Sequence, residues 1–221
     1  MTKIYKAAVF DMDGVIFDSE KIYRQSHHKY GESLGFSKID IDHFCDQCAG
    51  GTSKDNARRF KDHFGDRIEY SSYRAEVHKL VDAYGKNPGF DLKAGAKECL
   101  RSLKENGIKI ALATSTAKDR AEHYLKEHDI YKYFDEIVYG NQVEHGKPEP
   151  DIYLKACEKL GVEPRYAVGV EDSINGLAAS HRAGLFTVMV IDLIKPNEQA
   201  REYADQISNI ITEILPLFDI K

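Results

Sequence analysis

Two carboxylates, Asp11 and Asp13, end an apolar run near the N-terminus, in the stretch AAVFDMDGVIFDSE. Charge at the end of an apolar strand is costly, because a carboxylate loses hydration when it is buried. Such a carboxylate can instead serve as a nucleophile, for example toward phosphorus. A second acid two residues later can donate and accept protons during the same reaction. The pair therefore points to nucleophilic and acid–base chemistry.

Polar residues also follow three later apolar runs or lie in the loops after them. Thr114, Ser115 and Thr116 follow IALA, Lys147 lies in the loop HGKPEP, and Glu171 and Asp172 follow YAVGV. In open parallel sheets, ligands bind at the carboxyl ends of the strands. Four polar segments that converge at such an edge predict a functional site.

Each of these residue types suits phosphoryl transfer. Asp11 is the candidate nucleophile that would form an aspartyl-phosphate, and Asp13 is the candidate general acid and base. Lys147 would add positive charge toward phosphate oxygens from a loop that Pro148 and Pro150 stiffen. Together they predict a phosphate ester as the substrate.

The same residues predict a metal and a phosphate cradle. Mg²⁺ would reduce the repulsion between Asp11 and an anionic substrate. Asp172, with Glu171 in support, can complete the set of hard oxygen ligands that Mg²⁺ prefers. Thr114 and Ser115 precede a predicted helix, so their hydroxyl and backbone N–H groups can hold phosphate oxygens.

Strands that alternate with helices are predicted to position these residues. Buried strands are expected at residues 6–10, 108–114, 136–140, 165–170 and 186–191, and amphipathic helices of about ten residues lie between the last four. This alternation is typical of βαβ units and predicts an α/β fold with a parallel sheet.

The segment between the first two strands has a different pattern. Residues 20–84 are rich in charged residues and tyrosine, with apolar residues at helical spacing, so we expect an inserted group of helices. The breaker GKNPGF, residues 85–90, marks the return to the sheet. The predicted division is residues 1–17 and 88–221 for the catalytic core and residues 18–87 for a small helical cap.

Composition excludes several classes of function. The 221 residues carry a net charge of −5 without a long Lys/Arg block, which argues against a nucleic-acid partner. No apolar run approaches the roughly 20 residues of a membrane span. The apolar stretch AAVF is too short for a signal peptide. Four cysteines with no export signal favour the cytoplasm, and the lone pair Cys45 and Cys48 receives no role. A monomer is the default expectation.

The four polar segments also resemble a known family. The chain is similar to the haloacid dehalogenase superfamily, and within it to the β-phosphoglucomutase-like branch of phosphatases and mutases, from Val9 to about Gly184, in the ordered motifs FDMDGVIFDSE, ATST, GKPEPDIY and GVEDSINGLAAS. The resemblance implies a Rossmann-like core with a helical cap inserted after the first strand. It further implies that the backbone carbonyl of Asp13 helps hold the metal and that cap closure gates the site.

The resemblance also helps to distinguish between the reactions that the family catalyses. Dehalogenases of the superfamily lack an acid/base carboxylate at the position of Asp13, so phosphate-ester chemistry is favoured. True β-phosphoglucomutases carry a histidine where this chain has Tyr23. They also carry a cap arginine for the second phosphate, where this chain has Ser53 followed by Lys54, and lysine lacks the bidentate fork of arginine. Tyr23, Ser53 and Lys54 are accordingly the predicted cap contacts to substrate.

The sequence thus predicts a Mg²⁺-dependent phosphatase that acts on a small phosphorylated metabolite, a sugar phosphate. Two alternatives stay open: a β-phosphoglucomutase, which shares the aspartyl-phosphate but transfers the group to a sugar hydroxyl, and a non-catalytic binding protein. A binding protein has no need for an acid at Asp13, and this argues against the last of these.

Overall fold

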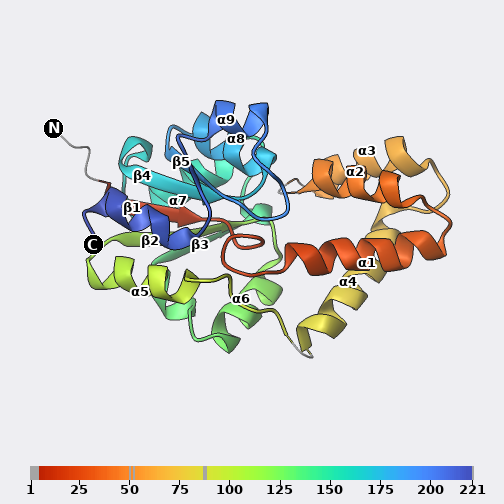
Figure 1. The fold of residues 1–221 in the computed structure, drawn as a ribbon, viewed down its shortest axis with the longest axis horizontal. Coiled ribbons are helices and arrows are strands. Elements are labelled where there is room, and N and C mark those ends of the chain that lie inside the picture. Colours follow the sequence, from red (N-terminus) through yellow and green to blue (C-terminus); the bar gives the residue numbers. More distant parts are fainter. Residues whose placement is uncertain (1–4, 50, 52, 87–88, 221) are drawn as a thin grey trace.

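A single parallel sheet forms the centre of the molecule (Figure 1). The computed structural model describes residues 5–49, 51, 53–86 and 89–220. All strand pairs in the described part are parallel, and the strands follow the order β3-β2-β1-β4-β5-β6. Their bounds are β1 (Ala7–Phe10), β2 (Lys109–Thr114), β3 (Glu136–Tyr139), β4 (Ala167–Glu171), β5 (Phe186–Val190) and β6 (Gln206–Ser208). The predicted α/β fold with a parallel sheet is confirmed.

The first strand lies in the middle of the sheet. In register, Phe10 of β1 pairs with Leu112 of β2 on one side and with Val170 of β4 on the other. The backbone N–H of Asp11 continues this pairing by donating to the carbonyl of Val170 at 3.0 Å. The order reverses at β1, so the residues after β1, β2 and β4 come together at a topological switch point.

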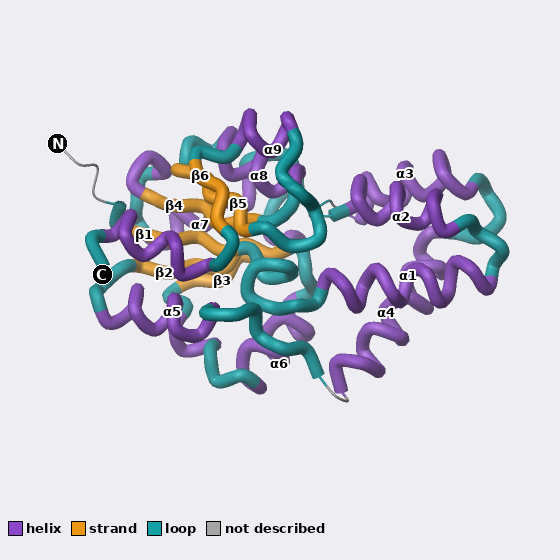
Figure 2. Tube along the Cα trace, in the orientation of Figure 1, coloured by secondary structure: helices purple, strands orange, loops and turns teal. Residues whose placement is uncertain are grey.

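Helices cover both faces of the sheet (Figure 2). On one face, α7 packs against β1, β2 and β3, and α8 packs against β4 and β5; on the other, α5 packs against β2 and the 3₁₀ helix η4. Ala7 and Val9 contribute to the core on the first face, and Ala8 and Phe10 to the core on the second. These alternating, small and apolar side chains explain the continuous apolar run of β1. The helix bounds are α5 (Ala96–Glu105), α6 (Lys118–Glu127), α7 (Asp151–Leu160), α8 (Ile174–Arg182), α9 (Glu198–Tyr203) and η4 (Ile211–Phe218).

A separate group of helices is inserted between β1 and β2 in the chain. It lies at one end of the molecule, away from the sheet (Figures 1 and 2). Its members are α1 (Glu20–Ser33), α2 (Lys38–Cys48), α3 (Ser53–Phe64) and α4 (Tyr70–Lys86). We call this group the cap. The predicted helical insertion is confirmed, whereas the predicted boundary at residues 87 and 88 lies outside the described residues.

Aromatic side chains pack the cap together. The rings of Phe36 and Phe64 stack with centroids 4.2 Å apart, and the Phe60 and Tyr73 rings lie 4.6 Å apart. Phe44 contacts Phe60 edge-on at 5.5 Å. Such pairs stabilise a small helical unit beyond the area they bury. The cap therefore has an aromatic core of its own.

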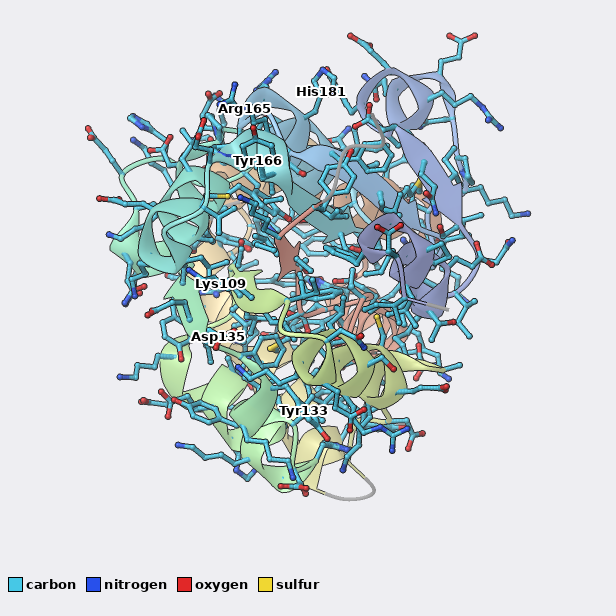
Figure 3. All side chains as sticks on the ribbon, turned by 90° about the vertical axis from the view of Figure 1, so that its left-hand side faces the viewer. Lys109, Tyr133, Asp135, Arg165, Tyr166 and His181 are labelled. Atoms are coloured by element: carbon cyan, nitrogen blue, oxygen red, sulfur yellow. The ribbon has the colours of Figure 1, made fainter. Side chains whose placement is uncertain are left out.

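Polar residues at the amino edge of the sheet serve the fold (Figure 3). Lys109 donates to the carbonyl of Leu160 at the end of α7, at 2.5 Å. Asp135 accepts from the backbone N–H of Ile110 at 2.8 Å and thereby fixes the start of the second strand. These contacts satisfy backbone groups at element ends.

No helix in the described part of the chain combines the length and the apolarity that crossing a membrane requires. All four cysteines are free thiols. Burial raises the pKa of the Cys48 thiol to about 12. A thiol with a raised pKa is a poor nucleophile, so Cys48 behaves as a packing residue.

Candidate active site

A buried lysine ties together two of the predicted carboxylates. Lys147 Nζ donates to Asp11 Oδ1 at 2.5 Å, to Glu171 Oε1 at 2.6 Å and to the carbonyl of Ala113 at 3.2 Å. Lys147 is only 1% exposed. A lysine is rarely buried to this degree unless it is paired, and here three oxygens from β1, β2 and β4 surround it. The structure therefore brings three of the predicted polar segments together.

Electrostatics in this cluster favour opposite charges on Lys147 and its partners. Burial by itself would lower the pKa of Lys147, but the Asp11 and Glu171 carboxylates raise it above its usual range. Burial also raises the pKa of Asp11 to about 7; Lys147 opposes this shift, whereas Glu171 and Asp13 add to it. Because one cation faces several acids, a further positive charge would stabilise the ionised form of Asp11.

Glu171 has its oxygens occupied by the protein. Its Oε1 accepts from the hydroxyl of Tyr153 at 2.8 Å as well as from Lys147, and its Oε2 accepts from Ser173 Oγ at 3.2 Å. A Cβ on Gly176 would lie 1.9 Å from the Glu171 carboxyl, so only glycine lets α8 begin this close. Glu171 is thus fixed from four sides and in turn fixes Lys147.

The cluster offers ligands for a cation. One carboxylate oxygen each from Asp11, Glu171 and Asp172 lies within 4.8 Å of the others, and all three residues are buried. Burial, and then the neighbouring carboxylates, raise the pKa of Asp172 well above its usual range. A buried set of hard oxygen donors with excess negative charge has the chemistry that suits Mg²⁺. Because Glu171 is already saturated, Asp11 and Asp172 are the better placed ligands.

Gly14 makes room for Asp172. Its φ of 75° is in the left-handed region, which favours glycine. A Cβ there would lie 2.1 Å from Asp172 Oδ2. The turn after Asp13 therefore requires glycine both for its backbone and for the position of the Asp172 carboxylate.

Asp13 is held by two hydroxyl groups. Ser19 Oγ donates to its Oδ1 and Thr116 Oγ1 donates to its Oδ2, both at 2.6 Å. Asp13 also lines the cleft described below. The two donors fix the orientation of the carboxylate. Thr116 was expected near the site as a polar residue at a strand end but was given no role, and Ser19 was not predicted as a site residue.

Of the three predicted phosphate-binding residues, Ser115 and Lys147 line the cleft and Thr114 does not. Thr114 is fully buried, and its hydroxyl accepts from the backbone N–H of Thr116 at 3.0 Å. Ser115 and Thr116 line the cleft instead. Side chains alternate across a strand, so a polar pair at its end sends one member inward. Thr114 shapes the loop, and Ser115 is presented to the cleft.

A cleft of about 960 Å³ lies between the sheet and the cap. The predicted cap residues Tyr23, Ser53 and Lys54 line it from one side, and Ser115 and Lys147 from the other. A volume of this size accommodates a small metabolite. The predicted substrate contacts therefore face the predicted catalytic cluster across one cavity.

Tyr23 is part of a contact between cap and core that the sequence did not reveal. Arg120 on α6 donates from Nη1 to the Tyr23 hydroxyl at 3.1 Å, and its Nη2 lies 3.1 Å from Asp82 Oδ1 on α4. Arg120 lines the cleft as well. A charged residue on the exposed side of a predicted helix carries no signal of such a role. The contact nevertheless fixes the hydroxyl of Tyr23.

A second contact joins cap and core at α8. Asn175 Nδ2 donates to the carbonyl of Ala49 at 2.7 Å and to that of Gln47 at 3.2 Å, just after and within α2. Together with Arg120, it connects the cap to the core through two different helices. The structure therefore describes a state in which the cap is in contact with the core.

The sequence is similar to a family profile and to proteins of known function. A family profile described as haloacid dehalogenase-like hydrolase matches residues 8–190. The phosphorylated carbohydrates phosphatase of Thermotoga maritima is 30% identical, over 95% of this chain and 100% of its own length. Hexitol phosphatase B of Escherichia coli K12 is 29% identical, over 94% of this chain and 93% of its own.

One solved structure is similar in fold over most of the chain. It is a variant of CbbY from Rhodobacter sphaeroides in complex with xylulose-(1,5)-bisphosphate. The likeness has a TM-score of 0.79 with 25% identity, and it covers 96% of each chain. Both the sheet and the cap therefore have counterparts in a relative of known structure.

Proposed function

The chain belongs to the haloacid dehalogenase-like hydrolase family, and from this premise we propose that it is a Mg²⁺-dependent phosphatase of a small phosphorylated sugar. One observation carries the proposal. The Asp11 carboxylate is held by Lys147 beside Asp172, and Asp13 is held two residues later at the cleft. This arrangement supplies a nucleophile, positive charge, metal ligands and a proton carrier. The named phosphatases among the relatives support the same reaction.

In the first step, an Asp11 oxygen attacks phosphorus and the bond from phosphorus to the sugar oxygen breaks. Asp13, in its protonated form, gives its proton to the departing alkoxide, so the alcohol leaves neutral. The phosphoryl group is then an acyl phosphate on Asp11. Lys147 and the loop around Ser115 stabilise the charge on the phosphoryl oxygens.

In the second step, water attacks the same phosphorus. Asp13, now a carboxylate, takes the proton from that water, and the bond between phosphorus and Asp11 breaks. Inorganic phosphate leaves, Asp11 is again a carboxylate, and Asp13 is again protonated. Ser19 and Thr116 hold Asp13 in place through both steps.

Asp11, Asp172 and the carbonyl of Asp13 would hold the cation, with Glu171 behind them. When bound, Mg²⁺ supplies positive charge that lowers the repulsion between Asp11 and an anionic substrate. Removing the metal with a chelator is expected to reduce phosphate release by about 10³-fold, since that charge lowers the barrier by several kcal/mol. Release should return with added Mg²⁺ but not with K⁺ at equal ionic strength. Full turnover in excess chelator would contradict the metal's role.

The proposed function is tested by a phosphate-release screen. Sugar phosphates, sugar bisphosphates, nucleoside monophosphates and phosphoglycolate are compared with and without Mg²⁺. Metal-dependent release from sugar phosphates is the expected result. β-Glucose 1-phosphate with a glucose 1,6-bisphosphate primer is included, with a coupled readout for glucose 6-phosphate. Glucose 6-phosphate with little free phosphate would replace the phosphatase proposal by the mutase alternative.

Arg120 is expected to affect substrate use through the cap. Arg120→Met keeps the length of the side chain but removes the bonds to Tyr23 and Asp82. We expect kcat/KM to fall about tenfold, because two charge-assisted or buried hydrogen bonds that place the cap are lost. Arg165→Met, which removes a surface pair with Glu163, is the matched control. Equal kinetics for the two variants would rule out a role for Arg120.

A further inference from the structure

A carboxylate outside all the motifs lies beside the metal ligands. Asp192 follows β5, the strand next to β4, and so stands at the same edge of the sheet as Asp172. Lys93 Nζ donates to its Oδ1 at 2.6 Å, and the Asp192 side chain is only 8% exposed. Its Oδ2 is buried and accepts no hydrogen bond from any described residue.

The unpartnered oxygen faces Asp172. A Cβ placed on Gly14 would lie 2.1 Å from Asp172 Oδ2 and 3.2 Å from Asp192 Oδ2. Both distances are measured from the same Cβ position. Asp172 Oδ2 and Asp192 Oδ2 are therefore no farther apart than the sum of the two distances. Both carboxylates approach the backbone of Gly14, which has no side chain to keep them away.

A buried acceptor in this position needs a donor, and the described residues do not supply one. An unsatisfied buried acceptor costs about 1–3 kcal/mol. Near Asp192 Oδ2 lies the carboxylate of Asp172, and none of the described residues donates a hydrogen bond to this oxygen. A water held by a divalent cation is a strong donor, and outer-sphere carboxylates commonly accept from such waters.

We propose that Asp192 is an outer-sphere acceptor for the cation of this site. Its Oδ2 accepts a hydrogen bond from a water bound to the cation that Asp11 and Asp172 would hold, and Lys93 fixes its other oxygen. The inference rests on the cation of the proposed function and adds to it a positioning residue on β5.

A purely structural ion pair explains only half of the geometry. The bond from Lys93 accounts for Oδ1 alone. It leaves Oδ2 buried and unsatisfied, next to other acids. The outer-sphere role accounts for both oxygens.

The test measures Mg²⁺ binding by calorimetry without any substrate. In Asp192→Asn, the amide oxygen can still accept the hydrogen bond from Lys93. The amide NH₂ group then takes the place of Oδ2, and it cannot accept a hydrogen bond from the water because it is itself a donor. We expect Mg²⁺ to bind about tenfold more weakly, the lower end of what removal of an outer-sphere partner costs. Asp205→Asn is the charge-matched control, because Asp205 accepts from the backbone N–H of Thr187 near the opposite end of β5, at 2.8 Å.

Thermal unfolding without metal separates this role from a structural one. The metal-free Asp192→Asn protein is expected to unfold at or above the parent's temperature, because one of several clustered negative charges is removed. Unchanged Mg²⁺ affinity in Asp192→Asn would overturn the inference, as would an equal loss in Asp205→Asn. Lys93→Met is a second variant that retains the acceptor and frees only its Oδ1, so a larger loss of Mg²⁺ affinity in Lys93→Met than in Asp192→Asn would also count against the inference.

The readout is independent of the proposed reaction. A parent protein that binds Mg²⁺ but hydrolyses no ester would refute the phosphatase while leaving the Asp192 measurement valid. A parent protein that hydrolyses sugar phosphates and binds Mg²⁺ as tightly as Asp192→Asn would refute the inference alone.

Discussion

Asp11→Asn is expected to lower phosphate release by at least about 10⁴-fold, because it removes the atom that attacks phosphorus. An amide oxygen is a weak nucleophile and carries no negative charge. It can still accept the hydrogen bond that Lys147 Nζ donates to Asp11 Oδ1 at 2.5 Å in the parent protein. The loss should therefore appear in the chemistry and leave the fold intact.

Three measurements on Asp11→Asn separate chemistry from folding. Turnover is measured on the best substrate of the screen, the unfolding temperature is compared with that of the parent, and substrate binding is measured by calorimetry. Asp205→Asn serves again as the charge-matched control, with turnover expected at the parental level. An Asp11→Asn protein that folds, binds substrate and turns over at the parental rate would exclude an aspartyl-phosphate on this residue.

The sheet could be predicted because its signals are local. Strands β2, β3, β4 and β5 are short apolar runs with helices between them, and the first strand has the same apolar character. Strand β6 (Gln206–Ser208) was not predicted, because its three residues form no apolar run. Carboxyl ends of parallel strands share one edge, so the convergence of Asp11, Lys147 and Asp172 follows from the topology alone. The inserted helices were recognisable because their periodicity differs from that of the flanking segments.

Side-chain direction limited the prediction of the site. Thr114 and Ser115 are adjacent polar residues at one strand end, and only the structure shows that the first is buried and the second lines the cleft. Glu171 was predicted as a supporting ligand, but its contacts with Tyr153 and Ser173 depend on how α7 and α8 pack. Packing between elements distant in sequence cannot be read from local pattern.

Single charged residues were the hardest to predict. Arg120 stands on a helix whose spacing marks it as an ordinary surface position, and Asp192 follows a strand without any motif. Their roles arise from contacts with residues about 38 and 99 positions away, namely Asp82 and Lys93. Such pairs become visible only when the fold brings them together.

Asp13→Asn is expected to slow turnover by about 10²–10⁴-fold, the usual range for a general acid and base. The two steps should respond differently. An ester with a good leaving group, such as 4-nitrophenyl phosphate, needs little protonation, so the first step should be largely spared. The second step still lacks its base, because an asparagine cannot take the proton from water. Phosphoenzyme should therefore accumulate on Asp11 with the activated ester.

Rapid-quench measurement of 4-nitrophenol tests this directly. With 4-nitrophenyl phosphate, a burst of one equivalent of 4-nitrophenol per enzyme followed by slow turnover is the expected result. With a sugar phosphate, no burst of the released sugar is expected. Ser19→Ala, which removes one of the two hydroxyl donors to Asp13, is the matched milder variant and should slow both esters by less. Equal slowing of both esters by Asp13→Asn without a burst would mean that Asp13 positions the substrate or the cation and carries no proton. The burst thus decides why a second acid stands two residues after the first: a positioning role predicts one rate defect for every ester, whereas a proton carrier predicts a defect that depends on the leaving group.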